Sequence, residues 1–330
     1  MTRLIIQIPC YNEEAILGAT LSGLPREVPG TTSVQWLVID DGSTDGTSEV
    51  ARRMGVDHVV RHARNRGLAQ AFQTGIDASL RLGADIIVNT DADNQYSGAE
   101  IPRLIQPILE GRADVVIGDR RTQDLEHFSP VTKVLQRFGS FMVRRLSDTD
   151  VPDAVSGFRA ISRRAATELN IISSFSYTIE MVIQLGKKRL AVVSVPVSAN
   201  PRTRKSRLFR SVRQFVAQSA ATMVRTYTMY EPLRVFTYIG LMVAVVGAAP
   251  ALRFLYYYLA GEGAGHVQSL VLGGVLLVVG LITVLIGVVA DLIAANRRLL
   301  EMVLERQRSV TESGDLARER EAERSTTRAG

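Results

Sequence analysis

The sequence predicts an α/β domain, with a largely parallel β-sheet covered by helices on both faces, followed by a two-helix transmembrane hairpin. In the first 120 residues, short runs rich in Val, Ile or Leu are each followed by a polar turn and a longer segment with helical spacing. Near the carboxyl end, two long runs carry no charge. Apolar strands that alternate with helices are typical of parallel sheets buried on both faces.

Five strands are expected, at residues 4–8, 36–39, 58–60, 85–88 and 114–117. Two apolar stripes at helical spacing lie between them, one formed by Ala69, Phe72, Ile76 and Leu80 and the other by Ile101, Leu104 and Ile108. Ligands of such sheets bind at the carboxyl ends of the strands. Polar clusters follow those ends in this sequence, so they are the candidates for a functional site.

Composition bounds the class of protein. The 330 residues are enough for one catalytic α/β domain and an additional segment. A single cysteine, Cys10, excludes an internal disulfide and suits a reducing compartment. The amino terminus has no basic segment followed by a long apolar one, so we expect no cleaved signal peptide. The formal net charge of +6 is unevenly distributed along the chain.

A basic segment precedes the apolar runs. Between Arg202 and Arg234 there are eight Lys or Arg residues and one acidic residue, Glu231. Apolar and small residues recur there at spacings of three and four, which predicts a helix with one apolar and one basic face. Such a helix is suited to lie on an anionic membrane surface. The alternative is a solvated basic linker helix that docks on the domain.

The two uncharged runs span residues 235–252 and 270–290. Each approaches the ~20 apolar residues that a membrane-spanning helix needs. The loop between them, residues 260–269, contains no Lys or Arg, whereas Arg234 and Arg297 flank the pair. Positive charge favours the cytoplasmic side, so we expect a hairpin in the plasma membrane with both termini and the α/β domain in the cytoplasm.

The chain beyond residue 305 is rich in Arg, Glu, Ser and Thr, which predicts a frayed helix or a partly disordered cytoplasmic tail. The expected organisation is therefore a catalytic domain at 1–200, basic amphipathic helices at 201–234, two transmembrane helices at 235–295 and the charged tail at 296–330.

Two polar clusters follow the first two strands. Residues 9–13 read Pro-Cys-Tyr-Asn-Glu, in which a proline and an aromatic ring could wall a nucleobase, although Asn and Glu could instead cap the next helix. Asp40 and Asp41 are adjacent carboxylates, which are costly unless they bind donors or a metal ion. A turn and a helix cap are the simpler explanation for Ser43 and Asp45.

A third cluster follows the fourth strand and contains Asp91, Asp93 and Gln95. Aspartates two residues apart in an extended segment project in the same direction. They can therefore place oxygen ligands on one Mg²⁺ or Mn²⁺ ion, which also takes waters and substrate phosphate oxygens. Gln95 repeats the spacing and could add a third oxygen.

Two further clusters carry charge. Residues 153–159 contain Asp153 and Arg159, for which a surface ion pair is the simpler alternative. Arg120 follows the fifth strand, and Arg202 and Arg207 precede the membrane segment. The planar guanidinium group matches the geometry of phosphate oxygens.

Five motifs follow one another in a pattern that resembles a known family: Pro-x-Tyr-Asn-Glu from residue 9, Asp-Asp-Gly-Ser-x-Asp-Gly-Thr from 40, Asn-x-Gly from 65, Asp-x-Asp-x-Gln from 91 and Asp-x-x-Ser-Gly-Phe-Arg from 153. With them, residues 3–207 resemble the family 2 glycosyltransferases of the GT-A fold. Their nearest resemblance is to the polyprenyl-phosphate glycosyltransferases, which include dolichol-phosphate mannose synthases and bacterial undecaprenyl-phosphate sugar transferases. A carboxyl-terminal transmembrane hairpin also occurs in that branch.

The resemblance implies roles for single residues. The nucleotide-binding candidates are Pro9, Tyr11, Glu13, Asp40, Asp41 and Asp91. The ligands of a Mg²⁺ or Mn²⁺ ion and the diphosphate would be Asp91, Asp93 and Gln95. The candidates for the acceptor phosphate are Arg120, Arg159, Arg202, Ser206 and Arg207. Family members often carry Arg-x-Gly-x-Ser-Lys before the membrane, and here Arg204 replaces that glycine.

The expected reaction is an inverting transfer of a sugar from a UDP- or GDP-linked donor to a polyprenyl phosphate, for cell-envelope glycan or glycoconjugate synthesis. Asp93, Arg120 and Asp153 are the expected catalytic residues, and Asp153 could act as a base or orient the acceptor. No nucleic-acid partner is expected, and a homo-oligomer is left open.

Two other functions remain as alternatives. A glycosyltransferase that acts on a sugar hydroxyl needs a true general base, and the Gln-x-x-Arg-Trp motif of processive members is absent, because the only tryptophan is Trp36. A non-catalytic membrane scaffold is disfavoured by the intact Asp-x-Asp-x-Gln set. A dinucleotide dehydrogenase is excluded, since no Gly-x-Gly-x-x-Gly follows the first strand.

Overall fold

The computed structural model describes residues 2–120, 149, 151–171, 177–198, 200, 220–221, 224–225 and 227–329. The chain divides into two compact units. The first comprises Met1–Met223 together with Glu305–Gly330, and the second comprises Val224–Leu304. Each unit is described by itself below.

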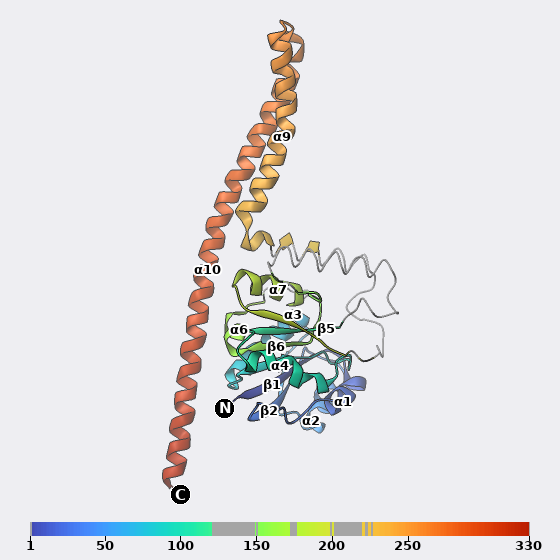
Figure 1. Cartoon of the computed structure of the whole chain (residues 1–330), viewed down its shortest axis with the longest axis vertical. Helices are drawn as coiled ribbons and strands as arrows, with labels where there is room; N and C mark the ends of the chain where they lie inside the picture. The colour runs from blue at the N-terminus through green and yellow to red at the C-terminus, as the bar shows by residue number, and fades with distance from the viewer. Residues whose placement is uncertain are drawn as a thin grey trace. The chain divides into compact units, whose positions relative to one another are not determined.

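The described part of the first unit contains a seven-stranded sheet with the strand order β3-β2-β1-β4-β6-β5-β7 (Figure 1). All neighbouring strands are parallel except β6, which runs antiparallel to β4 and to β5. The strands are β1 (Arg3–Cys10), β2 (Ser33–Asp40), β3 (His58–Arg61), β4 (Ile86–Asn89), β5 (Val115–Asp119), β6 (Arg159–Ser162) and β7 (Val192–Pro196). The five strands expected from the sequence are confirmed, whereas β6 and β7 were not predicted.

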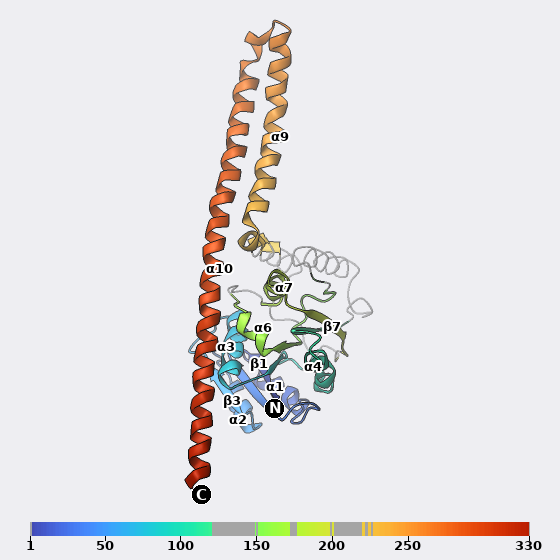
Figure 2. The same ribbon diagram turned by 60° about the vertical axis from the view of Figure 1, so that its left-hand side comes forward.

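Helices cover both faces of the sheet (Figures 1 and 2). On one face, Leu17 of α1, Ala51 of α2 and Leu104 of α4 join a core cluster with Ile6 and Ile8 of β1. On the other face α3 packs on β1 and β2, and α6 and α7 pack beside α3. The bounds of these helices are α1 (Glu14–Ser22), α2 (Thr47–Arg53), α3 (Leu68–Arg81), η1 (Gly98–Glu100), α4 (Ile101–Leu109), α6 (Arg163–Glu168) and α7 (Tyr177–Lys187).

The sheet and its helices form where the apolar pattern predicts them. Residues 4–6 and Ile8 of β1 are completely buried, as a strand covered on both faces requires. The predicted stripe of α3 is also buried, with Phe72 and Ile76 at 0% exposure. Phe72 stacks on Tyr177 of α7 with ring centroids 3.8 Å apart. The apolar face of α3 is therefore clamped between the sheet and α7.

The second unit contains two antiparallel helices that run side by side (Figures 1 and 2). These are α9 (Pro232–Leu259) and the part of α10 (Val267–Ala329) up to Leu304, joined through η2 (Gly263–His266). Both are long and apolar enough to cross a membrane, yet only 11% and 17% of the residues in their most apolar windows are buried. The core helix of a soluble protein would be mostly buried, so their exposed apolar surface suits lipid.

Glycines let the two helices of this hairpin approach closely. A Cβ on Gly240 would lie 2.6 Å from the carbonyl oxygen of Gly280, and a Cβ on Gly247 would lie 2.6 Å from Cβ of Leu276. Small residues at helix contacts are a common device in membranes, because they allow backbones to pack without an intervening side chain.

The predicted uncharged runs lie inside α9 and α10, and α9 continues past Arg253 as far as Leu259. The charged tail is helical as far as Ala329, which is one of the two states expected for it. Most of the predicted amphipathic segment, residues 201–219, lies outside the described residues. Residues 220–221, 224–225 and 227–230 are helical.

The glycine contacts predict a position-specific effect on the hairpin. Gly280→Leu should force α9 and α10 apart, because overpacking of a tight contact costs about 1–3 kcal/mol. Amide hydrogen exchange of α9 in detergent should therefore rise. Gly274→Leu is the matched control, because nothing lies within 4 Å of a Cβ at that position. Equal exchange in both variants would show that the helices do not depend on this contact.

Candidate active site

Four polar clusters meet at one edge of the sheet. β1, β2 and β4 are parallel neighbours, so residues 9–13, 40–45 and 91–95 follow strands that end at the same edge. β5 has the same direction as β4, because each is antiparallel to β6. Arg120 therefore leaves the sheet at this edge, and Arg159 begins β6 there. This is where parallel α/β sheets bind ligands.

Hydrogen bonds connect the loop after β1 to the loop after β2. Asn12 has a left-handed backbone with a φ of 54°. Its backbone N–H donates to Ser43 Oγ over 2.9 Å, and its side-chain oxygen accepts from the backbone N–H of Thr44 over 2.8 Å. The Glu13 N–H donates to Thr47 Oγ1 over 2.9 Å. Asn12 thus braces the second loop and does not cap α1, which begins without a side-chain cap.

The chain on either side of Asn12 differs in exposure. Pro9 is buried within β1, whereas 43% of Tyr11 is exposed at the edge of the sheet. Only the ring of Tyr11 is therefore openly available to a ligand, and Pro9 shapes the strand end behind it.

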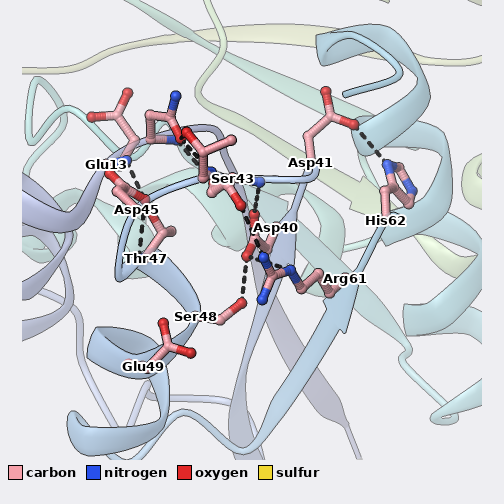
Figure 3. A network of polar contacts seen from close by, with 12 residues as sticks. Glu13, Asp40, Asp41, Ser43, Asp45, Thr47, Ser48, Glu49, Arg61 and His62 are labelled. Carbon is pink, nitrogen blue, oxygen red and sulfur yellow. Dashed lines mark hydrogen bonds and ion pairs between the residues drawn. The ribbon is translucent and has the colours of Figure 1, made fainter. Parts of the chain in front are cut away.

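Asp40 is occupied by protein donors (Figure 3). Its Oδ1 accepts from the backbone N–H of Ser43 over 2.8 Å, and its Oδ2 accepts from the hydroxyl of Ser48. Arg61 lies 3.5 Å from the same Oδ2. Asp40 has no exposed surface and fixes the turn between β2 and α2, and its expected contact with the nucleotide stays a prediction.

Asp41 points away from Asp40, toward His62 (Figure 3). Its Oδ1 accepts from His62 Nδ1 over 2.7 Å and from the Arg66 N–H over 2.8 Å, and its Oδ2 accepts from the Gly67 N–H over 2.8 Å. A carboxylate offers about four lone-pair positions. Three are used here, so Asp41, which is 3% exposed, is rigidly oriented with one lone-pair position not taken by these donors.

Gly42 makes this arrangement sterically possible. Its φ is +72°, and a Cβ would lie 2.4 Å from the backbone carbon of Arg64. The glycine of the Asp-Asp-Gly motif therefore lets residues 64–67 approach and donate to Asp41. The Asn-x-Gly motif at residue 65 serves the same contact.

The acidic loop, residues 91–95, carries the predicted metal ligands. Asp93 Oδ1 accepts from the Gln95 backbone N–H over 3.2 Å, and Asp93 Oδ2 accepts from Gln95 Nε2 over 2.5 Å. Removal from water and the neighbouring charge of Asp93 raise the pKa of Asp91 to about 7, against the opposing influence of Arg120 and Arg159. Two carboxylates arranged in this way favour a cation between them.

The donor set fits a hard divalent cation that shares its ligands with substrate. Among the described residues, no three His, Cys, Asp or Glu side chains gather into a metal site. The protein would therefore supply two carboxylates and the amide oxygen of Gln95. Diphosphate oxygens and waters would complete the shell, as is usual for Mg²⁺.

The backbone of Gly157 packs closely against this loop. A Cβ at residue 157 would lie 2.6 Å from Asp91 Oδ2. The Gly157 N–H donates to the Tyr96 hydroxyl over 3.0 Å, and its carbonyl oxygen accepts from Asn89 Nδ2 over 2.7 Å and from the Tyr177 hydroxyl over 3.4 Å. The peptide of Gly157 thus forms the wall behind Asp91.

Arg120 and Asp153 pair with each other. Arg120 Nε donates to Asp153 Oδ2 over 2.7 Å, and Nη2 donates to Oδ1 over 3.0 Å. Both side chains are largely buried, at 13% and 5% exposure. This bidentate geometry is the strong form of an arginine–carboxylate contact. The two predicted catalytic residues therefore act as one unit.

Arg159 is held by backbone carbonyl groups. It is completely buried, and its Nε, Nη1 and Nη2 donate to the carbonyl oxygens of Ser156, Thr178 and Ala154 over 2.8, 3.0 and 2.8 Å. Its expected contact with the acceptor phosphate therefore stays a prediction. Its charge lies behind the site and supports the carboxylate form of Asp91.

Comparison with known proteins identifies the family. The model of glycosyl transferase family 2 matches residues 5–169. The chain belongs to this family. It is 29% identical over 206 residues to the undecaprenyl-phosphate mannosyltransferase of Micrococcus luteus, covering 59% of this chain and 83% of that protein. It is 28% identical over 214 residues to the UDP-N-acetylglucosamine–dolichyl-phosphate N-acetylglucosaminyltransferase of Methanococcus voltae, covering 58% of this chain and 82% of that protein.

The fold also matches a solved glycosyltransferase. The glucosyl-3-phosphoglycerate synthase of Mycobacterium tuberculosis, crystallised with Mn²⁺, UDP-glucose and phosphoglyceric acid, superposes with a TM-score of 0.56. The identity is 22%, and the match covers 68% of this chain and 80% of that one. The present chain therefore has the GT-A fold, as the sequence predicts.

Several residues of the site escaped the sequence analysis. Tyr96, Asn89 and Tyr177 hold Gly157. Asn89 begins the third polar cluster but was assigned no role, and Tyr96 and Tyr177 belong to no motif that indicated function. Tyr96 directly follows Gln95, and Asn89 is a polar residue at the end of an apolar strand, so both carried a weak signal. The predicted acceptor residues Arg202, Ser206 and Arg207 lie outside the described residues.

The contact between Gly157 and Asp91 predicts a large effect of one methyl group. Gly157→Ala should displace the Asp91 carboxylate and reduce metal-dependent sugar transfer by about 100-fold, because misplacement of a group by about 1 Å has costs of that order. Gly18→Ala is the control, because a Cβ there meets only Val50 at 4.0 Å. Kinetics of the Gly157→Ala protein that match the wild type would refute the predicted role of this contact.

Proposed function

We propose that this glycosyltransferase transfers a sugar, with inversion, from a UDP- or GDP-linked donor to a polyprenyl phosphate at the cytoplasmic face of the membrane. The two relatives described above act, by name, on undecaprenyl phosphate and dolichyl phosphate. The observation that carries the proposal is the bidentate pair of Arg120 and Asp153, which places a guanidinium group near Asp91 and engages both oxygens of the carboxylate that could have served as a base.

The donor would lie over the loops after β1, β2 and β4. The exposed ring of Tyr11 can stack on a nucleobase, and the remaining lone pair of Asp41 can accept from an N–H of uracil or guanine. Asp91, Asp93 and Gln95 would hold Mg²⁺ or Mn²⁺, which stabilises negative charge on a leaving diphosphate. The relatives use mannose and N-acetylglucosamine, so the donor site of this branch accommodates different sugars.

The acceptor side follows from the charge of Arg120. A phosphate monoester has its second pKa near ~6, so it is already a nucleophilic anion at neutral pH and needs orientation rather than deprotonation. Asp153 uses both oxygens to hold the guanidinium of Arg120, and taking a proton would remove the charge that does this. We therefore assign Asp153 the role of positioning Arg120, whose free N–H groups can meet the phosphate.

The hairpin would keep the site at the depth of the lipid headgroups. Basic residues lie before α9 and at the end of the apolar part of α10, and the connection between the helices lacks Lys and Arg. This charge distribution supports a cytoplasmic catalytic domain. A lipid acceptor held in the same plane meets the site at a raised local concentration.

The metal ligands give the first prediction for this function. Asp91→Ala or Asp93→Ala should abolish transfer without loss of folded protein, because both residues lie on a loop at the sheet edge. Removal of divalent cation from the wild type by a chelator should have the same effect, reversed by Mg²⁺ or Mn²⁺. Transfer would be followed with radiolabelled nucleotide-sugar, and full activity in chelator would disprove a metal-dependent site.

The Arg120–Asp153 pair gives the second prediction for this function. Arg120→Ala should weaken the use of polyprenyl phosphate by roughly 10- to 100-fold with little change in donor KM, since a charge-assisted hydrogen bond contributes about 1.5–3 kcal/mol. Asp153→Asn cannot take a proton but can still accept one hydrogen bond from Arg120, so measurable activity should remain. Steady-state kinetics with acceptor and donor varied separately would measure both.

Thermal unfolding of both variants serves as the control, because loss of Arg120 leaves Asp153 buried without its partner. Arg120→Lys keeps the charge and should recover part of the acceptor affinity. An inactive but folded Asp153→Asn protein beside a nearly normal Arg120→Ala protein would instead identify Asp153 as a base. The hydroxyl-acceptor alternative would then replace the proposal.

A further inference from the structure

Asn200, which follows β7, forms two hydrogen bonds with the acidic loop. The backbone N–H of Asn200 donates to the carbonyl oxygen of Gln95 over 2.8 Å. The side-chain Nδ2 of Asn200 donates to the carbonyl oxygen of Asn94 over 2.9 Å. A single residue, 106 positions away from Asn94, thus binds two successive carbonyl groups of the loop.

Asn94 and Gln95, whose carbonyl groups Asn200 binds, determine where Asp93 lies. Asn94 has a left-handed backbone with a φ of 57°, which Asn adopts more readily than most residues other than glycine. Gln95 donates to Asp93 through both its backbone N–H and its side chain. Asn200 therefore holds the left-handed turn and the residue that orients the Asp93 carboxylate.

Other contacts fix the loop at different points. The Thr20 hydroxyl of α1 donates to the carbonyl oxygen of Ala92 over 2.8 Å, and Tyr96 contacts Gly157. These contacts lie before and after the turn, whereas the bonds of Asn200 lie on the turn itself. Support for residues 94 and 95 thus comes from the chain that follows the sheet.

That chain is anchored on its way to Asn200. The Val197 N–H donates to the carbonyl oxygen of Asp119 over 2.9 Å, and the Ser198 N–H donates to Glu100 Oε1 over 3.2 Å. In sequence, Asn200 directly precedes Pro201 and the basic segment that begins at Arg202. The contact with the acidic loop is therefore the last described one before the chain turns basic.

We propose that Asn200 is a positioning residue for the divalent cation and the donor diphosphate, which it serves by holding the acidic loop in its binding conformation. The inference rests on the proposed function in that Asp91 and Asp93 bind the cation. It also ties the donor side of the site to the chain that leads to the membrane segment.

The test compares Asn200→Ala with Ser198→Ala in the full-length protein in detergent. Asn200→Ala removes the bond to Asn94 and leaves the backbone bond to Gln95. Ser198→Ala alters an exposed side chain two residues earlier, while its backbone bond to Glu100 is retained. Hydrogen exchange of residues 91–96 would be measured without metal, and the affinity for Mn²⁺ with UDP by calorimetry.

In Asn200→Ala, exchange of the loop amides should rise and the affinity for Mn²⁺ with UDP should fall by roughly 3- to 10-fold, the loss expected for one hydrogen bond. The thermal midpoint and the KM for polyprenyl phosphate should stay close to the wild type, as should all properties of Ser198→Ala. Unchanged loop exchange or unchanged affinity in Asn200→Ala would overturn the inference, as would a lowered thermal midpoint with normal affinity.

Failure of the proposed acceptor would be distinguishable. A wild-type chain that binds Mn²⁺ and UDP but transfers no sugar to polyprenyl phosphate would refute that acceptor. The effect of Asn200→Ala on loop exchange and on Mn²⁺–UDP affinity would still be expected and would still support the inference.

Discussion

The close packing of the Gly157 backbone against the Asp91 carboxylate is the constraint on which the rest of the site depends. Since a Cβ at residue 157 would lie 2.6 Å from the Asp91 carboxylate, the chain entering β6 has to pass the end of β4 as bare backbone. Tyr96, Asn89 and Tyr177 then satisfy both polar groups of that peptide. The acidic loop and the segment from Asp153 to Arg159 therefore form one rigid body, although 62 positions separate Asp91 from Asp153.

The charges of the site are arranged around this contact. The charge of Asp93 raises the pKa of Asp91, and the charges of Arg120 and Arg159 oppose this. Without a cation, burial and the charge of Asp93 raise the pKa of Asp91 to about 7. A divalent ion would stabilise both carboxylates in their charged form and add the positive charge that a leaving diphosphate requires. Asp153 holds Arg120, which in the proposed function would meet the anionic acceptor.

Much of the fold followed from the sequence because its causes are local. The five predicted strands are apolar runs bounded by turns, and each motif lies at a strand end, so their convergence at one sheet edge was predictable. β6 escaped because it reads Arg-Ala-Ile-Ser, which begins with a charged residue and contains no run of Val, Ile or Leu. β7 reads Val-Val-Ser-Val-Pro and carried a strand pattern that the sequence analysis did not use.

The roles of single side chains depended on contacts that no spacing reveals. Asp40 and Arg159 belong to motifs and carry charge, so they resembled ligand-binding residues. In the structure, Asp40 accepts hydrogen bonds from Ser43 and Ser48, and Arg159 donates to three carbonyl groups, contacts that the motifs did not predict. Asn200 belongs to no motif, so no sequence pattern indicated its contact with the acidic loop. It reaches that loop because β7 is parallel to β5 and ends on the same side of the sheet as β4.

The most direct test of the account is the choice of acceptor. Purified full-length protein with Mg²⁺ or Mn²⁺ would be supplied with a panel of UDP- and GDP-linked sugars and with either polyprenyl phosphate or the matching polyprenol, and the products would be analysed by mass spectrometry. The account predicts a glycosyl phosphate polyprenol with at least one donor and no product from the polyprenol. Transfer to the polyprenol, or to a sugar hydroxyl but not to polyprenyl phosphate, would contradict it.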